Sequence, residues 1–418
     1  MTTWTDLRRP LPQWYRATPF GIFVHWGAYA VPAWAEPIGA LGTFPDDVWF
    51  AHNPYAEWYW NTIRIEGSPA ALRHQELYGG APYDDFLDAW TAERFDPGAM
   101  CRLFAEAGAG YVVPTTKHHD GITLWQAPET GTRNTVDRGP RQDLVAGFAA
   151  GARASGLRLG LYYSGGLDWF VRPMPPHQTN DSVGGESGRP QDAEYGAYCA
   201  RHVRDLVERY QPDIFWNDIN WPDEAKDFSP DGLGTLVADF YAARPEGVVN
   251  DRFGGVHHDY RTSEYESGRE AESEGAWEQC RGLGWSFGYN QAETAEHYLS
   301  GPQAARLLTD VVSRGGHLLL NVGPKADGTL PELQQQALET MAAWVPQAKP
   351  FLYGERRPVS HEVTAAEGTW VRVVASPEGE AAFVDRADDA TDALVHIDGR
   401  AHPVRLDPSR PGPVVVAL

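Results

Sequence analysis

Short apolar runs alternate with amphipathic segments along the first 350 residues of the chain. The runs are rich in aromatic and β-branched residues, which is typical of buried strands, and the amphipathic segments have apolar residues at helical spacing. Eight runs are predicted to be strands, the seventh being the weakest: 19–27, 111–116, 157–163, 213–218, 248–252, 260–265, 284–290 and 317–323. Six segments are predicted to be helices: 96–108, 142–155, 192–210, 231–243, 302–314 and 331–345.

Strands that alternate with helices predict a mostly parallel sheet with both faces covered. Eight such units in about 350 residues match a (β/α)8-type barrel, although residues 253–290 contain no clear helix. After residue 350 the pattern changes to short alternating runs with Pro- and Gly-rich turns between them, which predicts antiparallel strands. We therefore predict two domains, a (β/α)8-like catalytic domain at 1–350 and a small antiparallel β-sandwich at 351–418.

Polar and aromatic residues gather where the predicted strands end. In a (β/α)8 barrel the active site lies at the carboxyl ends of the strands. A barrel that served only as a scaffold would not need ionisable groups along that rim, so these endings predict a functional site. The endings are His25-Trp26, His118-His119-Asp120, Tyr162-Tyr163, Trp216-Asn217-Asp218, Asn250-Asp251-Arg252, Glu264 and Asn321.

The fourth predicted strand ends in a carboxylate, Asp218, that is placed between two tryptophans, Trp216 and Trp221. Indoles offer an apolar platform, and the neighbouring Asn217 amide can orient a hydroxyl group, so this combination suits a sugar ring. The alternative is that Asp218 only caps the following loop, a common position for Asp.

Composition narrows the classes of partner. The chain has 418 residues and a net charge of -22, which argues against nucleic acid and anionic membranes as partners. Sixteen Trp residues are consistent with a carbohydrate site. The three cysteines are odd in number and far apart, and the chain shows no signal peptide and no apolar run of ~20 residues, so we predict a cytoplasmic protein without disulfides.

The histidines admit two interpretations. Adjacent residues at a strand end are expected to point in opposite directions, which makes His118-His119 a poor metal chelate, and the chain lacks His-x-His and His-Glu-x-x-His motifs. Hydrogen bonds from neutral imidazoles to sugar hydroxyls fit better, with one of the two histidines as a possible loop anchor. A metal-dependent hydrolase using His25, His118 and His119 stays as an alternative, as do a sugar-binding protein without catalysis and a barrel glycosidase for another sugar.

The remaining chemistry rests on carboxylates. A glycosidase needs one ionised carboxylate and one carboxylic acid on either side of the scissile bond. Asp218 and Glu264 end the fourth and sixth predicted strands, near enough on a barrel to face one sugar. A Pro- and Gly-rich tract at 172–190 is a candidate lid on the same rim. Other glutamates could replace Glu264, the last three being candidates for ordinary surface: Glu57, Glu266, Glu270, Glu272 and Glu274.

The ordered motifs resemble the α-L-fucosidases of glycoside hydrolase family 29, in particular bacterial members. The resemblance covers about residues 15–350, and the C-terminal part resembles the family's β-sandwich only in outline. The motifs are Gly21 to Gly27, Asn53 to Trp58, Thr115 to Gly121, Tyr162 to Ser164, Phe215 to Asp218, Asn250 to Arg252, Ser286 to Asn290, and Asn321 to Pro324 with Asp327-Gly328.

The resemblance implies a retaining exo-hydrolase of terminal α-L-fucosides that uses no cofactor, with a fucosylated oligosaccharide or glycoside as substrate. From the sequence we expect no metal, and a homo-oligomer is the candidate assembly. The nucleophile of the family falls on Asp218, and the Thr-x-Glu-Tyr glutamate of bacterial members, the acid/base, falls on Glu264. Asn220 departs from the glycine that many members have, which could alter leaving-group preference. The sugar contacts implied by the resemblance are His25, Glu57, Trp58, His118, His119, Tyr162, Trp216, Arg252 and Phe287.

Overall fold

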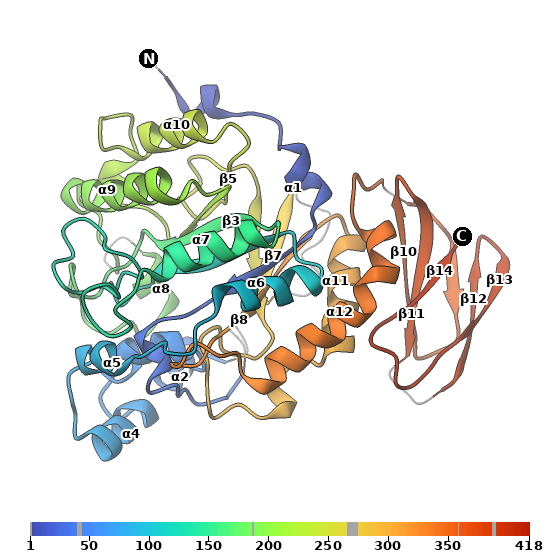
Figure 1. Cartoon of the computed structure of the whole chain (residues 1–418), viewed down its shortest axis with the longest axis horizontal. Helices are drawn as coiled ribbons and strands as arrows, with labels where there is room; N and C mark the ends of the chain where they lie inside the picture. Colours follow the sequence, from blue (N-terminus) through green and yellow to red (C-terminus); the bar gives the residue numbers. More distant parts are fainter. Residues whose placement is uncertain (1, 40–43, 186–187, 266–274, 358, 387–389) are drawn as a thin grey trace.

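The computed structural model describes the whole chain except residues 1, 40–43, 186–187, 266–274, 358 and 387–389. Eight parallel strands form one curled sheet in the order β5-β4-β3-β2-β1-β8-β7-β6, which confirms the prediction of a (β/α)8-type barrel (Figure 1). The strands are β1 (Phe20–Val24), β2 (Tyr111–Lys117), β3 (Arg158–Ser164), β4 (Ile214–Asp218), β5 (Val248–Val249), β6 (Arg261–Glu264), β7 (Trp277–Gly282) and β8 (His317–Val322).

The first and last barrel strands along the chain, β1 and β8, pair with each other in the middle of the sheet. Ile22 of β1 lies opposite Leu320 of β8 on one side and Val112 of β2 on the other. The two sheet edges are β5 and β6, and the described residues record no pairing between them. The barrel is therefore open on the side where its two shortest strands lie, and β6 is the strand that carries Glu264.

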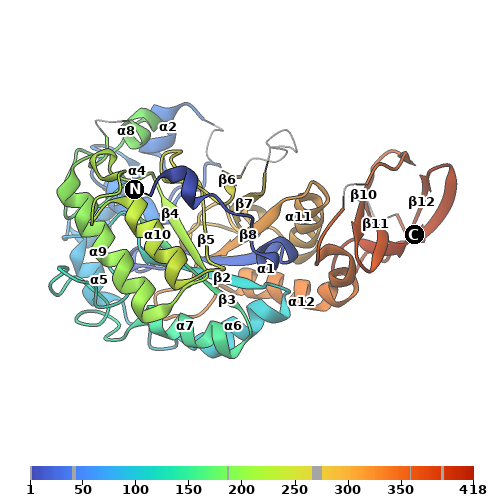
Figure 2. The ribbon, with the colours of Figure 1, turned by 90° about the horizontal axis from the view of Figure 1, so that it is seen from above.

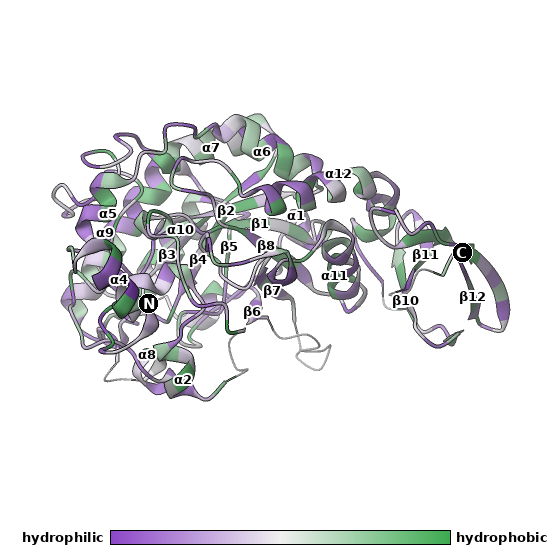
Figure 3. Cartoon of the chain, turned by 90° about the horizontal axis from the view of Figure 1, so that it is seen from below, coloured by the Kyte–Doolittle hydropathy of each residue, from purple (hydrophilic) through white to green (hydrophobic). Residues whose placement is uncertain are grey.

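Six long helices follow the predicted order and cover the outside of the sheet (Figure 2). Several begin at an aspartate whose side chain accepts a hydrogen bond from a backbone N–H of the first turn, as Asp96, Asp143 and Asp192 do. Figure 3 shows α6 and α7 banded by hydropathy, as expected for helices with one buried face. The helices are α6 (Pro97–Glu106), α7 (Leu144–Ala154), α9 (Ala193–Tyr210), α10 (Leu233–Ala243), α11 (Gly301–Ser313) and α12 (Glu332–Leu352).

Other helices lie in the connections. Two of them, α2 after β1 and α8 after β3, contribute residues to the site. These helices are α1 (Gln13–Ala17), α2 (Asp46–Ala51), α3 (Tyr59–Thr62), α4 (Pro69–Tyr78), α5 (Asp84–Ala89) and α8 (Asn180–Gly184). Among the described residues no helix is both long and apolar enough to cross a bilayer. The cytoplasmic location and the homo-oligomer stay predictions.

Two sequence predictions are wrong in detail. The seventh strand is Trp277–Gly282, not 284–290, which is a loop. Its Glu278 is fully buried, and the Glu278 carboxylate accepts hydrogen bonds from Trp216 Nε1 and Tyr111 Oη. The last helix was predicted to end at 345 but continues to Leu352, because buried Ala348 and Leu352 extend its apolar face past two prolines.

The C-terminal residues form two three-stranded antiparallel sheets, as predicted, with Val373, Val395 and Leu406 in the small core between them. They lie beside α11 and α12 (Figure 1). The sequence shows four alternating runs here, at 369–374, 381–385, 393–397 and 414–418. It does not reveal β9, which is exposed, or β13, whose Pro403 is tolerated on an edge strand. The strands are β9 (Val363–Ala365), β10 (Thr369–Ser376), β11 (Gly379–Arg386), β12 (Asp392–Ile397), β13 (Arg400–Arg405) and β14 (Val414–Ala417). The domain boundary at residue 350 stays a prediction, since α12 runs through it.

Candidate active site

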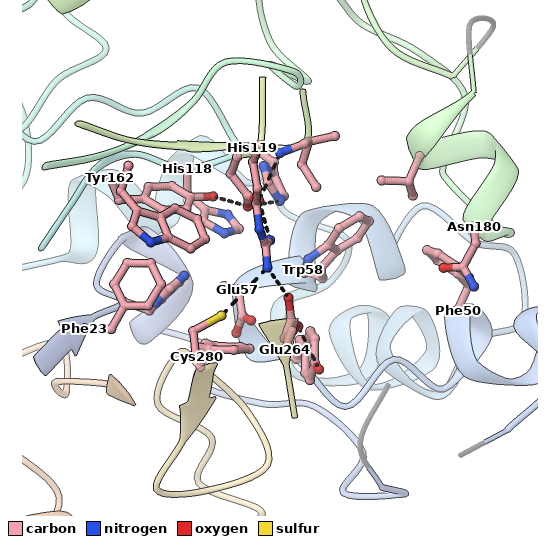
Figure 4. A pocket seen from close by; sticks show the side chains of 18 of the residues that line it. Phe23, Phe50, Glu57, Trp58, His118, His119, Tyr162, Asn180, Glu264 and Cys280 are labelled. Atoms are coloured by element: carbon pink, nitrogen blue, oxygen red, sulfur yellow. Dashed lines mark hydrogen bonds and ion pairs between the residues drawn. The ribbon is translucent and has the colours of Figure 1, made fainter. Parts of the chain in front are cut away.

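A pocket opens at the carboxyl ends of the barrel strands and contains all eleven residues predicted for the site (Figure 4). It encloses about 630 Å³, including its open mouth, which is in the range of small-molecule sites. Its remaining lining residues are Phe23, Trp49, Phe50, Tyr55, Asn180, Val183, Ile219 and Cys280.

Asp218 is the last residue of β4 and points into this pocket. Its Oδ2 accepts a 2.8 Å hydrogen bond from Tyr162 Oη, and its Oδ1 accepts bonds from Arg252 Nη1 at 2.7 Å and Ile219 N at 2.9 Å. The loop-capping interpretation is thus met in part, by the Ile219 bond. The other two donors stabilise a negative charge at a fixed place on the pocket wall.

Glu264 is the last residue of β6 and faces the same pocket. Its Oε1 accepts a bond from Tyr55 Oη at 3.2 Å, and its Oε2 accepts a bond from Arg252 Nη2 at 3.3 Å. Burial raises the pKa of Glu264, because the low dielectric disfavours the charged carboxylate. A raised pKa is the property that a general acid requires.

Arg252 joins the two carboxylates, since Nη1 binds Asp218 and Nη2 binds Glu264. Its Nε donates to Thr262 Oγ1 at 3.0 Å, and this hydroxyl in turn donates to Asp251 Oδ1 at 2.8 Å. The guanidinium also lies over the Trp216 ring, 4.8 Å from its centroid. Besides the two carboxylates, Thr262 and Trp216 therefore orient the guanidinium, and the placement of both carboxylates depends on it.

His118 and His119 both line the pocket, contrary to the prediction that they point in opposite directions. The alternation of a strand does not apply to them, because β2 ends at Lys117 and the two residues lie in the following turn. Their rings are 4.0 Å apart between centroids. Burial lowers the pKa of both well below its usual range and that of His25 to about 4, so all three are neutral at pH 7.

Glu57 is the glutamate that could compete with Glu264 for the role of acid. It is buried, and burial raises its pKa to about 7. Its Oε2 already accepts hydrogen bonds from Gly288 N at 2.7 Å and Ser286 Oγ at 3.3 Å. Glu57 therefore anchors the loop that carries Phe287 into the pocket. The other competing glutamates, at 266 and 270–274, lie outside the described residues.

Within the described part of the chain, no three His, Cys, Asp or Glu side chains are grouped so that they could hold a metal ion. The three pocket histidines instead meet aromatic and polar side chains. His25 lies 4.9 Å from the Phe287 ring and His118 lies 5.6 Å from the Tyr162 ring, centroid to centroid. Such a surface of rings and polar edges suits a sugar.

A model of the alpha-L-fucosidase family matches residues 1–349. The chain belongs to the alpha-L-fucosidase family. It is accordingly an enzyme, a glycoside hydrolase with the activity of that family.

Relatives and solved structures agree with this membership. The chain is 31% identical over 362 residues to an alpha-L-fucosidase of Dictyostelium discoideum, covering 84% of this chain and 74% of that protein. It is 33% identical to the human tissue alpha-L-fucosidase, covering 82% and 69%. A crystal structure of Thermotoga maritima alpha-fucosidase is 41% identical, with a TM-score of 0.83 over 94% of this chain and 88% of that one.

Several pocket residues of this fucosidase were missed from its sequence. Phe23 could have been found, because it lies two residues before His25 in the predicted strand 19–27 and is therefore expected on the same face. Cys280 was missed because the seventh strand was placed too late in the sequence. Asn180 and Val183 belong to α8, inside the predicted lid at 172–190. That this segment closes over the site stays a prediction.

The departure at Asn220 has a backbone explanation. Asn220 has a φ of 98° and follows Ile219, which has a φ of 63°. Glycine adopts such angles without strain, and Asn tolerates them better than most residues. Asn220 Oδ1 accepts a 2.8 Å bond from Trp221 N, and Ile219 rather than Asn220 lines the pocket.

Proposed function

We propose that this chain is a retaining exo-α-L-fucosidase in which Asp218 is the nucleophile and Glu264 is the general acid and base. The observation that carries the proposal is the shared guanidinium: Arg252 binds both carboxylates at the wall of one pocket. The two groups differ in the way a retaining pair requires. Asp218 has three donors that stabilise its charge, whereas burial raises the pKa of Glu264.

The reaction proceeds in two displacements. Asp218 attacks the anomeric carbon of a terminal α-L-fucoside while Glu264 gives its proton to the departing oxygen, so a covalent fucosyl-enzyme forms and the aglycone leaves. Glu264, now ionised, removes a proton from water, which attacks the same carbon and releases fucose with retained configuration. Arg252 stays positively charged throughout and balances the charge as it moves between the two carboxylates.

The pocket supports recognition of one terminal sugar. Trp58, Trp216 and Phe287 supply apolar surface for a sugar face and the C6 methyl group, while the neutral histidines and Glu57 supply hydrogen-bonding atoms. A fucosylated glycoside is the substrate class that this lining fits. The Thermotoga maritima enzyme has been solved in complex with fucose, which supports the same assignment here.

Azide rescue tests both roles. We expect Asp218→Gly and Glu264→Gly to lose turnover of an aryl α-L-fucoside and to regain it with azide. The Asp218 variant should give the β-fucosyl azide, because azide replaces the nucleophile in a single displacement. The Glu264 variant should give the α-fucosyl azide, because azide replaces water in the second displacement.

A matched variant separates the competing glutamate. Glu57→Gly should show no azide product, since Glu57 anchors a loop and does not transfer a proton. If Glu57→Gly gives the α-azide and Glu264→Gly keeps its activity, the acid is Glu57 and the assignment of Glu264 fails. If the wild-type protein does not hydrolyse the fucoside, the proposed substrate itself is wrong.

A further inference from the structure

Asn321, at the end of β8, bonds to a histidine of the pocket from behind. Its Oδ1 lies 2.7 Å from Nδ1 of His25, and its Nδ2 donates to the Phe287 carbonyl oxygen, also at 2.7 Å. All three groups are buried. The Phe287 carbonyl can only accept, so the Nδ2 end of the amide must face it.

This orientation fixes the proton on His25. With Nδ2 facing Phe287, the Asn321 atom that faces His25 is Oδ1, which is only an acceptor. Nδ1 of His25 must therefore carry a hydrogen and donate it. In a neutral imidazole the other nitrogen, Nε2, is then unprotonated and can only accept a hydrogen bond.

The tautomer of His119 is fixed in the same way, through a hydroxyl group. Its Nδ1 lies 2.7 Å from Ser164 Oγ, which donates its one hydrogen to the Leu167 carbonyl oxygen at 2.9 Å. Ser164 Oγ therefore accepts from Nδ1 of His119. Nε2 of His119 is left unprotonated, 3.9 Å from Oδ2 of Asp218, so two acceptors face each other across this gap.

We propose that Asn321 and Ser164 are positioning residues that set the tautomers of His25 and His119, so that each imidazole offers an unprotonated Nε2 to a sugar hydroxyl. The two hydroxyls bound there must donate hydrogen rather than accept it. His118 provides a contrast, because its Nδ1 is buried and has no hydrogen-bond partner among the described residues. Its tautomer is left free to follow the ligand. The proposal rests on the proposed function for the identity of the sugar, but not for the tautomers.

The surroundings keep both rings neutral. Burial lowers the pKa of each, and Arg252 opposes a further positive charge near both. Asp218 favours a charge on His25, yet the pKa of His25 still falls to about 4. Lys117 and His177 also oppose a charge on His119. The tautomers therefore hold across the pH range in which the enzyme is assayed.

Nitrogen NMR on the protein labelled with ¹⁵N-histidine tests the tautomers directly. We expect Nδ1 of His25 and of His119 to have the shift of a protonated nitrogen and Nε2 that of an unprotonated one, with signals assigned from the His25→Gln and His119→Gln spectra. Signals for Nε2–H tautomers or imidazolium rings in the wild type at pH 7 would overturn the proposal.

Two variants test the positioning role. Ser164→Ala removes the acceptor behind His119 and should give mixed tautomers of that ring only. Asn321→Asp places a carboxylate beside His25 and should shift that ring toward imidazolium, raising its pKa. Asn134→Asp is the matched control, because Asn134 is also a buried amide that bonds to backbone groups, in a loop outside the pocket. It should change neither histidine.

Competitive inhibition by L-fucose and its monodeoxy and monofluoro derivatives tests the consequence for ligands. Fluorine can accept but cannot donate a hydrogen bond. At the hydroxyls that meet His25 and His119, deoxy and fluoro analogues should therefore weaken binding alike, by about 10-fold or more. In Asn321→Asp the charged ring donates from Nε2, so the fluoro analogue should bind better than the deoxy one at the position that meets His25.

The outcomes separate this proposal from the proposed function. If at no position of the sugar do the deoxy and fluoro analogues lose affinity equally, the acceptor role of the histidines is wrong. If the wild type does not bind L-fucose at all, the proposed function fails, while the nitrogen shifts still decide the tautomers. Unchanged histidine shifts in both Ser164→Ala and Asn321→Asp would show that other contacts set the tautomers.

Discussion

The two proposed catalytic carboxylates stand on strands of very different character. β4 has five residues, all buried, and pairs with β3 on one side and β5 on the other. β6 has four residues, of which only Ser263 is buried, and among the described residues it pairs only with β7. Accordingly the Asp218 side chain is 10% exposed and that of Glu264 is 20% exposed.

This difference matches the two tasks. A nucleophile must reach one carbon atom along one line, and a strand bonded on both sides holds it there. An acid and base exchanges protons with two different oxygens, the aglycone and then water. Its strand lies at an edge of the sheet, and its carboxylate is placed by two side chains, Tyr55 and Arg252. Both carboxylates thus accept side-chain hydrogen bonds, but among the described residues only the strand of Asp218 is also paired on both sides.

The largest expected effect is the loss of kcat when either carboxylate is removed. The two variants should differ in how this loss depends on the leaving group. Asp218→Ala should lower kcat by about 10⁴-fold or more for every aryl fucoside, because bond formation itself is lost. Glu264→Ala should lower it by about 10² to 10⁴-fold for poor leaving groups and much less for dinitrophenyl, which departs without a proton. Steady-state kinetics over a series of aryl fucosides checks both.

A control residue lies at the other end of the strand that carries Asp218. Asp213 precedes β4 and accepts hydrogen bonds from Leu159 N and Arg158 Nη1, away from the pocket. Asp213→Asn should reduce stability and leave kcat within a few-fold of wild type. An equal loss for all leaving groups in Glu264→Ala would contradict its role as acid.

The next effect concerns Arg252, which hydrogen-bonds to both carboxylates. Arg252→Lys cannot bind both carboxylates in one plane, so kcat should fall by about 10² to 10³-fold. Arg252→Leu should show a similar loss and a further change. The Arg252 charge opposes the rise in the pKa of Glu264 that burial causes, so its removal raises that pKa further.

The pH dependence of kcat/KM distinguishes these two variants. Glu264 must be protonated to act as acid, so the basic limb follows its pKa. This limb should move to higher pH in Arg252→Leu and stay close to its wild-type position in Arg252→Lys. A basic limb that moves to lower pH in the leucine variant would refute the assignment.

A smaller effect concerns the free energy of unfolding, because three buried or half-buried acids lie on β7 or bind the loop at 284–290 that follows it. Glu278 lies on β7, Glu293 accepts a bond from Ser286 N, and Glu57 binds the same loop. Burial raises the pKa of Glu57 and Glu278 to about 7 and that of Glu293 to about 8. The folded state therefore holds protons that the unfolded state has released above about pH 4.5.

Stability should consequently be greatest at or below the unfolded pKa and should fall as the pH rises through 7 to 8. Each group contributes at most roughly 3 to 5 kcal/mol to this fall, Glu293 the most. Thermal unfolding between pH 5 and 9 measures it, and Glu278→Gln should flatten the slope. The exposed Glu332→Gln should leave the slope as it is. A stability that rises over this range would show that these acids are ionised in the folded protein.

The smallest effect concerns α8, at the mouth of the pocket. Asn180 N and Nδ2 donate to the two carboxylate oxygens of Asp46 on α2, in an exposed position. Asp46→Ala should loosen this contact and change kcat/KM by roughly threefold, because one exposed hydrogen-bonding group contributes little. Asp181→Ala, on the exposed side of α8, should have no effect. A change above about 30-fold would make α8 part of the machinery that binds the sugar.

Strands β1 to β4 were well predicted from the sequence, whereas β7, the neighbour of the edge strand β6, was not. β1 to β4 are apolar runs that end in polar residues, so their positions and their site residues follow from the hydrophobic pattern. β7 contains Trp277-Glu278-Gln279-Cys280, in which Glu278 and Gln279 are both buried and Glu278 accepts hydrogen bonds from Tyr111 and Trp216. Hydrophobic periodicity treats polar residues as surface, so it placed the seventh strand at 284–290 instead of 277–282. Cys280 was missed for this reason.

The sequence by itself determined the alternation of strands and helices, the two carboxylates at strand ends and the family motifs around them, because these depend on local periodicity and residue type. Only the tertiary structure decided that Arg252 bonds both carboxylates, that His118 and His119 face one pocket, and that Asn321 orients His25. These contacts join residues far apart in the chain or follow from the path of a turn. Their geometry exists only once the sheet has curled and brought β4, β6 and β8 around one pocket.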